Sequence, residues 1–142
     1  MEIYKGIATF SGIAIGKVLY YSRGEYQIRQ CLVSNIKKEI SDFQEARLQA
    51  VHKLHELYEA SRLGYEQEAR VFLRQIKLLE SESYQNAIES SIASEKVNAA
   101  YAVMINRDEL VETFRNLEEP VIRRRINDMQ EISNRLIQIL GG

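Results

Sequence analysis

Glycine is distributed very unevenly along this chain of 142 residues. Four of its seven glycines lie within the first 24 residues, and Gly64 is the only glycine between residues 25 and 140. Because glycine interrupts regular helices, the glycine-poor stretch favours long helices, whereas the glycine-punctuated start favours short strands and turns. The sequence therefore predicts an N-terminal β segment with a connector over residues 1–33, followed by a helical unit over residues 34–142.

The N-terminal segment consists of short apolar runs between turn residues. Residues 3–8 and 12–21 are rich in β-branched and aromatic side chains, so we expect one or two strands there. Two strands alone are only marginally stable in water. We therefore expect these strands to belong to a larger sheet, and the helical remainder of the chain is predicted to contribute no strand to it.

From Ser34 onward, apolar residues recur with the period of an amphipathic helix. A first helix is predicted from a Ser34 cap to near Gly64, and a second over residues 66–92, broken at residues 81–83. A third is predicted from an Asn98 cap to about residue 115, and a fourth has Pro120 in its first turn and ends at residues 141–142.

Each predicted helix has one apolar stripe, and the stripes should meet in a common core. The predicted core residues are Ile36, Ile40, Phe43, Ala50, Val51, Leu54, Leu57, Phe72, Ile76, Leu79, Tyr101, Ile105, Leu110, Phe114, Ile122, Ile126, Met129, Leu136 and Leu140. Four such segments with short connections are typical of an antiparallel four-helix bundle. We therefore predict a mainly α fold with a short β N-terminus.

Charge and composition argue against several classes of function and partner. Nineteen basic and twenty acidic side chains give a net charge of -1, which argues against nucleic acid as a partner. A single cysteine, no signal-peptide pattern and no long apolar run predict a cytoplasmic protein without a membrane partner. Residues 56–119 carry thirteen acidic and seven basic side chains, a net of -6, which predicts either attraction of a basic protein or a solvated bundle surface.

The two histidines, His52 and His55, lie three residues apart on the predicted first helix. A metal site in a bundle generally draws ligands from several helices, and no other predicted helix contains a histidine, so surface histidines are expected. The sequence around His55 is also similar to the His-Glu dipeptide of sensor-kinase dimerisation helices. A histidine phosphotransfer bundle that uses His55 is therefore one alternative function.

Four segments occur in a set order along the chain. They are residues 6–17 (G-I-A-T-F-S-G-I-A-I-G-K), 68–80 (E-A-R-V-F-L-R-Q-I-K-L-L-E), 98–103 (N-A-A-Y-A-V) and 125–136 (R-I-N-D-M-Q-E-I-S-N-R-L). Together they resemble, in the same order, the N-terminal domain of enzyme I of the bacterial phosphoenolpyruvate:sugar phosphotransferase system. This family is the phosphoenolpyruvate-protein phosphotransferases.

The resemblance implies that the helical unit docks the phosphocarrier protein HPr in sugar uptake, while a neighbouring α/β subdomain carries the phosphorylated histidine. The β segment of residues 1–33 would belong to that otherwise absent subdomain, with the remainder of enzyme I as a further partner. The family's acceptor histidine would lie beyond Gly142, and neither His52 nor His55 matches it. The chain alone is therefore predicted to be inactive, with no catalytic residue, no cofactor and no metal, since the Mg²⁺ of the family is bound elsewhere.

The resemblance also implies a docking surface on the second and last helices. It comprises Glu66, Glu68, Phe72, Gln75, Leu78, Glu82 and Gln130. Gln75 stands where the family usually has histidine, and Lys77 replaces an apolar residue. Because HPr is basic around its active histidine, Lys77 predicts a weakened electrostatic match and an affinity on the order of micromolar or looser. The other alternative function is a stand-alone helical adaptor or regulator that binds a different protein.

Overall fold

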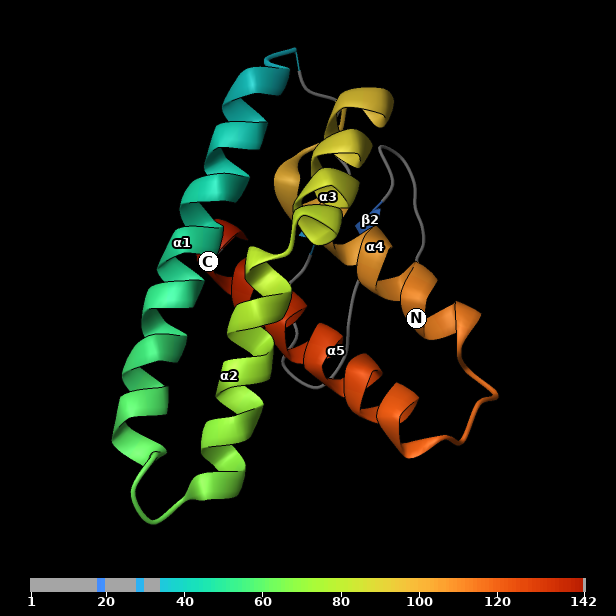
Figure 1. The fold of residues 1–142 in the computed structure, drawn as a ribbon. Coiled ribbons are helices and arrows are strands. Elements are labelled where there is room, and N and C mark those ends of the chain that lie inside the picture. The colour runs from blue at the N-terminus through green and yellow to red at the C-terminus, as the bar shows by residue number, and fades with distance from the viewer. Residues whose placement is uncertain (1–17, 20–27, 30–33, 142) are drawn as a thin grey trace.

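A computed structural model describes residues 18–19, 28–29 and 34–141 (Figure 1). Its helices are α1 (Ile36–Ser61), α2 (Glu66–Glu80), α3 (Glu82–Glu95), α4 (Ala99–Thr113) and α5 (Pro120–Gly141). Two short strands, β2 (Val18–Leu19) and β3 (Ile28–Arg29), pair antiparallel, with Val18 opposite Arg29. The predicted mainly α fold with a β N-terminus is confirmed. The other predicted strand residues lie outside the described part of the chain, and the division at residue 33 stays a prediction.

Two helical hairpins form the body of the fold. In Figure 1, α1 and α2 run side by side in opposite directions, and the α4–α5 hairpin crosses them so that α5 packs against both. The helix α3 follows α2 after a change of direction and packs on α4 and α1. The predicted second helix is thus two helices, as its expected break implied. The two hairpins bring α2 and α5 into contact although they are far apart in the sequence.

The helix ends agree with the predicted boundaries, with one correction. The N-cap of α1 is Asn35 and not Ser34, because α1 starts at Ile36 and Asn35 Oδ1 accepts a hydrogen bond from the Lys38 amide at 2.9 Å. Gly64 allows the tight turn into α2 with a φ of 100°, which is strained for other residues. Ser81 ends α2 and caps α3, since its hydroxyl accepts a hydrogen bond from the Tyr84 amide at 3.3 Å.

The core draws on all five described helices, and most of the predicted core residues belong to it. The buried ones are Phe43, Ala50, Val51, Leu54, Ile76, Leu79, Met129 and Leu136. Partly buried ones packed against them are Ile36, Ile40, Leu57, Phe72, Tyr101, Ile105, Leu110 and Leu140. The stripes predicted for the first two helices are therefore confirmed.

Two parts of the core prediction were wrong. Phe114 lies outside the core cluster, and α4 instead buries Ala102, Val103 and Met104 most deeply. The reason is that α4 is covered by α3 as well as α5, so its buried face is wider than one stripe. Ile122 and Ile126 also lie outside the core cluster, because the first turns of α5 extend past the body of the core and line surface cavities.

Tyr84 places a hydroxyl inside this core. Its ring packs against Phe43, with centroids 6.3 Å apart, and the residue is only 6% exposed. Neither the Tyr84 hydroxyl nor the buried Ser133 hydroxyl has a hydrogen-bond partner of normal geometry among the described side chains. Burial raises the pKa of Tyr84 well above its ordinary value of about 10, and the neighbouring Ser133 hydroxyl opposes part of that shift.

Replacing Tyr84 by phenylalanine should make the protein less sensitive to alkaline pH. The folded state retains the phenol proton while the unfolded chain loses it above about pH 10, so this stabilising contribution is present below that pH and lost above it. We expect wild type to lose about 1 kcal/mol more than Tyr84→Phe between pH 9 and pH 10.5. Urea unfolding at both pH values measures this, with the exposed Tyr65→Phe as control. Equal losses in wild type and Tyr84→Phe would contradict it.

Candidate functional site

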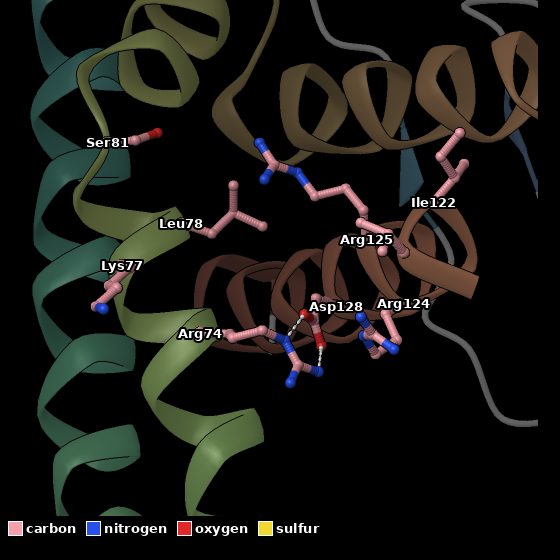
Figure 2. A pocket seen from close by; sticks show the side chains of 9 residues that line it. Arg74, Lys77, Leu78, Ser81, Ile122, Arg124, Arg125 and Asp128 are labelled. Carbon is pink, nitrogen blue, oxygen red and sulfur yellow. Dashed lines mark hydrogen bonds and ion pairs between the residues drawn. The ribbon is translucent and has the colours of Figure 1, made fainter. Parts of the chain in front are cut away.

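A half-open cavity of about 470 Å³ lies between α2 and the first turns of α5 (Figure 2). We call it the α2–α5 groove. It is lined by Arg74, Lys77, Leu78, Ser81, Val121, Ile122, Arg124, Arg125 and Asp128. Its apolar surface comes from Leu78, Val121 and Ile122, and Val121 is 60% exposed. An exposed β-branched side chain beside an apolar hollow indicates a surface that a partner can cover.

Helical periodicity explains why these residues meet. The lining residues of α2 and its end are 74, 77, 78 and 81, and those of α5 are 121, 124, 125 and 128. Both sets have the spacing i, i+3, i+4 and i+7, which places each set on one face of its helix. The hairpin crossing turns these two faces toward each other and leaves the groove between them.

The groove carries mainly positive charge. Four of its lining side chains are cationic, and Asp128 is its only carboxylate. Asp128 is paired with Arg74, whereas Lys77, Arg124 and Arg125 form no ion pair with any described carboxylate. All three are exposed, and Figure 2 shows Arg125 extending from α5 toward the α2 side of the groove. The groove therefore presents three uncompensated cations around an apolar centre.

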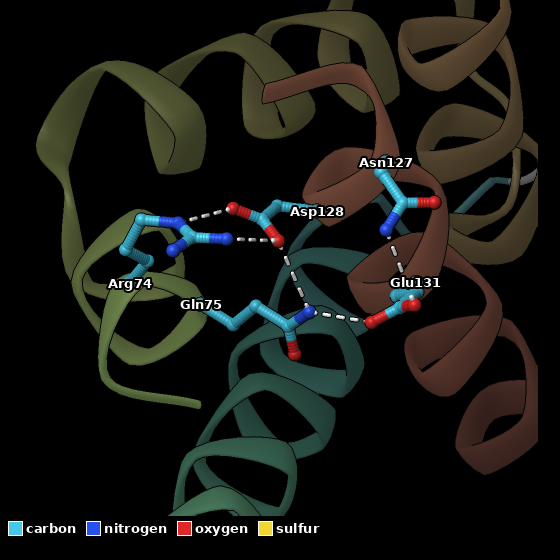
Figure 3. A network of polar contacts seen from close by, with 5 residues as sticks. All are labelled: Arg74, Gln75, Asn127, Asp128 and Glu131. Atoms are coloured by element: carbon cyan, nitrogen blue, oxygen red, sulfur yellow. Dashed lines mark hydrogen bonds and ion pairs between the residues drawn. The ribbon is translucent and has the colours of Figure 1, made fainter. Parts of the chain in front are cut away.

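A polar network joins the two walls beneath these cations (Figure 3). Arg74 donates to both oxygens of Asp128, with Nε 2.9 Å from Oδ2 and Nη2 3.4 Å from Oδ1. The buried Gln75 amide donates to Glu131 Oε1 at 2.6 Å and to Asp128 Oδ1 at 3.4 Å. Asn127 donates to the other Glu131 oxygen at 3.4 Å. Because a charge-assisted bidentate pair is directional, the network holds α2 and α5 in one register.

A second cavity, of about 460 Å³, lies on the other side of α5, toward α4. It is lined by Val111, Arg115, Arg123, Ile126, Asn127 and Gln130. This lining is more polar than that of the α2–α5 groove, and Arg115 pairs with Glu112 at 3.0 Å while Arg123 approaches Glu118 at 3.8 Å. Since its cations have carboxylate partners, this cavity presents less free charge than the groove.

The predicted surface position of the histidines is confirmed. His52 and His55 are exposed on α1, and His52 Nε2 lies 3.2 Å from Glu56. Within the described ranges, no three His, Cys, Asp or Glu side chains gather closely enough to hold a metal ion. None of the described helices is both long and apolar enough to cross a membrane.

The model of the N-terminal domain of PEP-utilising enzymes matches residues 5–125 of this chain. The chain belongs to this family. Phosphoenolpyruvate-protein phosphotransferases are similar to it: that of Mycoplasma capricolum subsp. capricolum is 29% identical over 140 residues, covering 96% of this chain and 24% of the relative. That of Haemophilus influenzae has the same identity and coverage, and that of Bacillus subtilis is 24% identical over 144 residues, covering 100% of this chain and 25% of the relative.

A solved structure has a similar fold. The solution structure of Enzyme I (nEIt) superposes with a TM-score of 0.75 at 22% identity, covering 81% of this chain and 48% of that one. This likeness shows that the PEP-utilising enzyme domain has the helical fold of an enzyme I N-terminal domain. The chain spans about a quarter of the length of the curated relatives it matches.

The structure of this PEP-utilising enzyme domain separates the predicted docking residues into distinct places. Leu78 lines the groove, Phe72 is half-buried against the core, and the exposed acidic residues lie in the first turns of α2 and α3. These acidic residues are Glu66, Glu68 and Glu82. None of the three lines the groove, so the expected acidic surround of Leu78 is absent from its lining.

Two of the predicted docking residues lie away from the open part of the groove, and their docking role stays a prediction. Gln75 is 1% exposed, because it is turned toward α5, where it donates to Asp128 and Glu131. Its hydrogen bonds join the two walls of the groove. Gln130 lies on the α4 side of α5 and lines the second cavity, about half a helical turn away from Asp128, so it does not share a surface with Leu78.

The cations Arg74, Arg124 and Arg125 were not among the predicted site residues of the PEP-utilising enzyme domain. The charge of residues 56–119 is acidic, and the basic run at residues 123–125 lies just beyond that region. The shared i, i+3, i+4 spacing of cations and apolar residues on the two helices is the sequence signal that would have identified them.

Proposed function

We propose that this chain is the carrier-docking part of an enzyme I-type phosphoenolpyruvate-protein phosphotransferase in phosphotransferase-system sugar uptake. The α2–α5 groove receives an HPr-type phosphocarrier, and the phosphorylated histidine belongs to another part of the longer protein. The observation that carries this proposal is the apolar part of the groove, where the exposed Val121 and the partly exposed Ile122 lie beside Leu78, which is 7% exposed. Family membership supports the proposal, because the relatives it matches are phosphoenolpyruvate-protein phosphotransferases.

The anatomy of the groove suits a transient complex. Transient interfaces generally combine a small apolar centre with a charged rim, and here Leu78, Val121 and Ile122 form the apolar part while charged residues of both helices line the rest. A carrier must dissociate after each phosphoryl transfer, so a small contact of this kind is suitable. The polar network beneath keeps the two walls in place, so binding requires little rearrangement of the backbone.

Titration of the isotope-labelled chain with the HPr-type carrier of the same organism tests this proposal. Amide shifts are expected in residues 74–81 and 121–128, because these line the groove. Val121→Asp should weaken binding about tenfold or more, since it places a charge in the apolar centre of the interface. The control is Leu48→Asp on α1, because Leu48 is 58% exposed, much like Val121 at 60%.

Several results would contradict the proposal. Shifts confined to α1, or equal affinities for wild type and Val121→Asp, would show that the carrier does not use the groove. No shifts at millimolar carrier would show that this chain does not dock it. Both substituted positions are exposed, so thermal unfolding of the two variants should match wild type and confirm that any loss of binding is local.

A further inference from the structure

We propose that the cavity between α4 and α5 binds a small organic anion with two negative charges, the chemistry that phosphate monoesters and dicarboxylates share. The cavity has a volume of about 460 Å³, and small-molecule sites generally have volumes of about 300 to 1,000 Å³. It lies on the side of α5 that faces away from the α2–α5 groove. The proposed site is therefore separate from the carrier groove, and it can be tested without a carrier.

Two arginines from different segments line this cavity. Arg115 lies in the turn that follows α4, and Arg123 lies in the first turn of α5. A guanidinium group is planar and always charged, and it donates two parallel hydrogen bonds to a carboxylate or a phosphate group. Two guanidinium groups beside one small cavity therefore match a compact ligand with two negative charges.

The ion pairs of these arginines are weak enough for a ligand to replace them. Arg115 Nη2 lies 3.0 Å from Glu112 Oε1, whereas Arg123 Nη1 and Glu118 Oε1 are 3.8 Å apart, too far for a hydrogen bond. The four side chains are between 58% and 87% exposed, and exposed pairs contribute little free energy. A dianion that contacts both guanidinium groups therefore displaces the two glutamates at a small cost.

The rest of the lining suits an anion that has a carbon skeleton. Asn127 and Gln130 add two side-chain amides, which can donate to further ligand oxygens. The Gln130 side chain makes no hydrogen bond within the described part of the chain, and Asn127 makes only the 3.4 Å bond to Glu131. Val111 and Ile126 are partly exposed apolar side chains of the same cavity. A short hydrocarbon part of the ligand would cover them.

The α2–α5 groove has more unpaired cations, but they are arranged differently. Figure 2 shows Lys77 and Arg124 at opposite edges of the groove, with Leu78 between them. Cations that are set apart around an apolar centre suit the extended surface of a protein, whereas a small anion needs donors that meet at one place. We therefore assign the small-molecule site to the cavity between α4 and α5.

Titration of the isotope-labelled chain with propyl phosphate and with succinate tests the site. At a pH of about 7.5 a phosphate monoester carries nearly two negative charges. Amide shifts are expected in residues 111–115 and 123–130, with a Kd on the order of 1 mM for at least one probe. The probe that binds more tightly identifies the source of the charge. Propyl phosphate should also bind at least about threefold more tightly than inorganic phosphate, because its carbon chain covers the apolar side chains.

Paired variants at constant ionic strength separate a specific site from general attraction of anions. Arg115→Gln with Arg123→Gln should weaken binding at least tenfold, because both guanidinium contacts are lost. The control is Arg62→Gln with Arg70→Gln, which makes the same change of net charge at exposed positions and should stay within about twofold of wild type. All four positions are exposed, so circular dichroism should show both variants folded.

The glutamates that pair with the arginines provide a test in the opposite direction. Glu112→Gln with Glu118→Gln should tighten binding about twofold or more, because the ligand no longer displaces a carboxylate. Equal or weaker binding in this variant would contradict contact between the ligand and the two guanidinium groups. The inference would also be overturned by equal losses in the two arginine double variants, by shifts confined to residues 74–81, or by no shift with either probe at about 20 mM.

Discussion

Truncating Leu79 to alanine is expected to lower the free energy of unfolding by about 3 to 5 kcal/mol. Leu79 is fully buried near the end of α2, where the α1–α2 hairpin meets the rest of the core. Its removal leaves a cavity that well-packed neighbours can fill only in part, so the lost transfer free energy and the cavity penalty add. Urea unfolding measured by circular dichroism gives the change directly.

Two other leucines provide the comparison for this substitution. Leu48→Ala on α1 should change stability by less than about 0.5 kcal/mol, because Leu48 is 58% exposed. Leu78→Ala should cost about 2 kcal/mol, since the space it vacates opens into the α2–α5 groove and admits water. A loss at Leu79 no larger than that at Leu78 would contradict the position of the core described above.

The second large effect is expected from Arg74→Leu, which should destabilise the fold by about 2 to 3 kcal/mol. Asp128 has a side chain only 6% exposed, and Arg74 is the partner that compensates its charge. Without Arg74, the carboxylate would retain only the longer hydrogen bond from Gln75 at 3.4 Å among the described side chains. The 41% exposure of the Arg74 side chain keeps the expected loss below that of a fully buried pair.

A double-mutant cycle separates this explanation from loss of helix packing. Asp128→Asn removes the buried charge, so the double variant Arg74→Leu with Asp128→Asn should recover more than half of the stability lost in Arg74→Leu. Strict additivity of the two single changes would mean that the ion pair does not couple α2 to α5. Denaturant unfolding of the four proteins under one condition provides the measurement.

The ends of the helices were largely predictable from local sequence features. Gly64 and Pro120 mark the turn after α1 and the start of α5, and Ser81 marks the break between α2 and α3. These features act within a few residues of chain, so the sequence displays them directly. The face of α4 was harder to predict, because Phe114 satisfies the period of the stripe but the second covering helix, α3, shifts what is buried.

The groove was less predictable, because its properties arise between helices. Leu78 was identified from a family motif, but the burial of Gln75 depends on where α5 packs, which no local pattern specifies. The same packing brings Arg124 and Arg125 opposite Lys77, 47 residues or more away in the sequence. The net charge summed along the sequence predicted an acidic docking surface. In the folded structure, the side chains that line the groove are mainly positive instead.

The crossing of two hairpins also has a kinetic consequence. The contacts within the α1–α2 and α4–α5 hairpins join neighbouring segments and can form early, whereas the contacts between α2 and α5 close a long stretch of chain. The groove has one wall in each hairpin, so it does not exist until the hairpins have met. The groove therefore forms only after the two hairpins have packed together, and an incompletely folded chain lacks it.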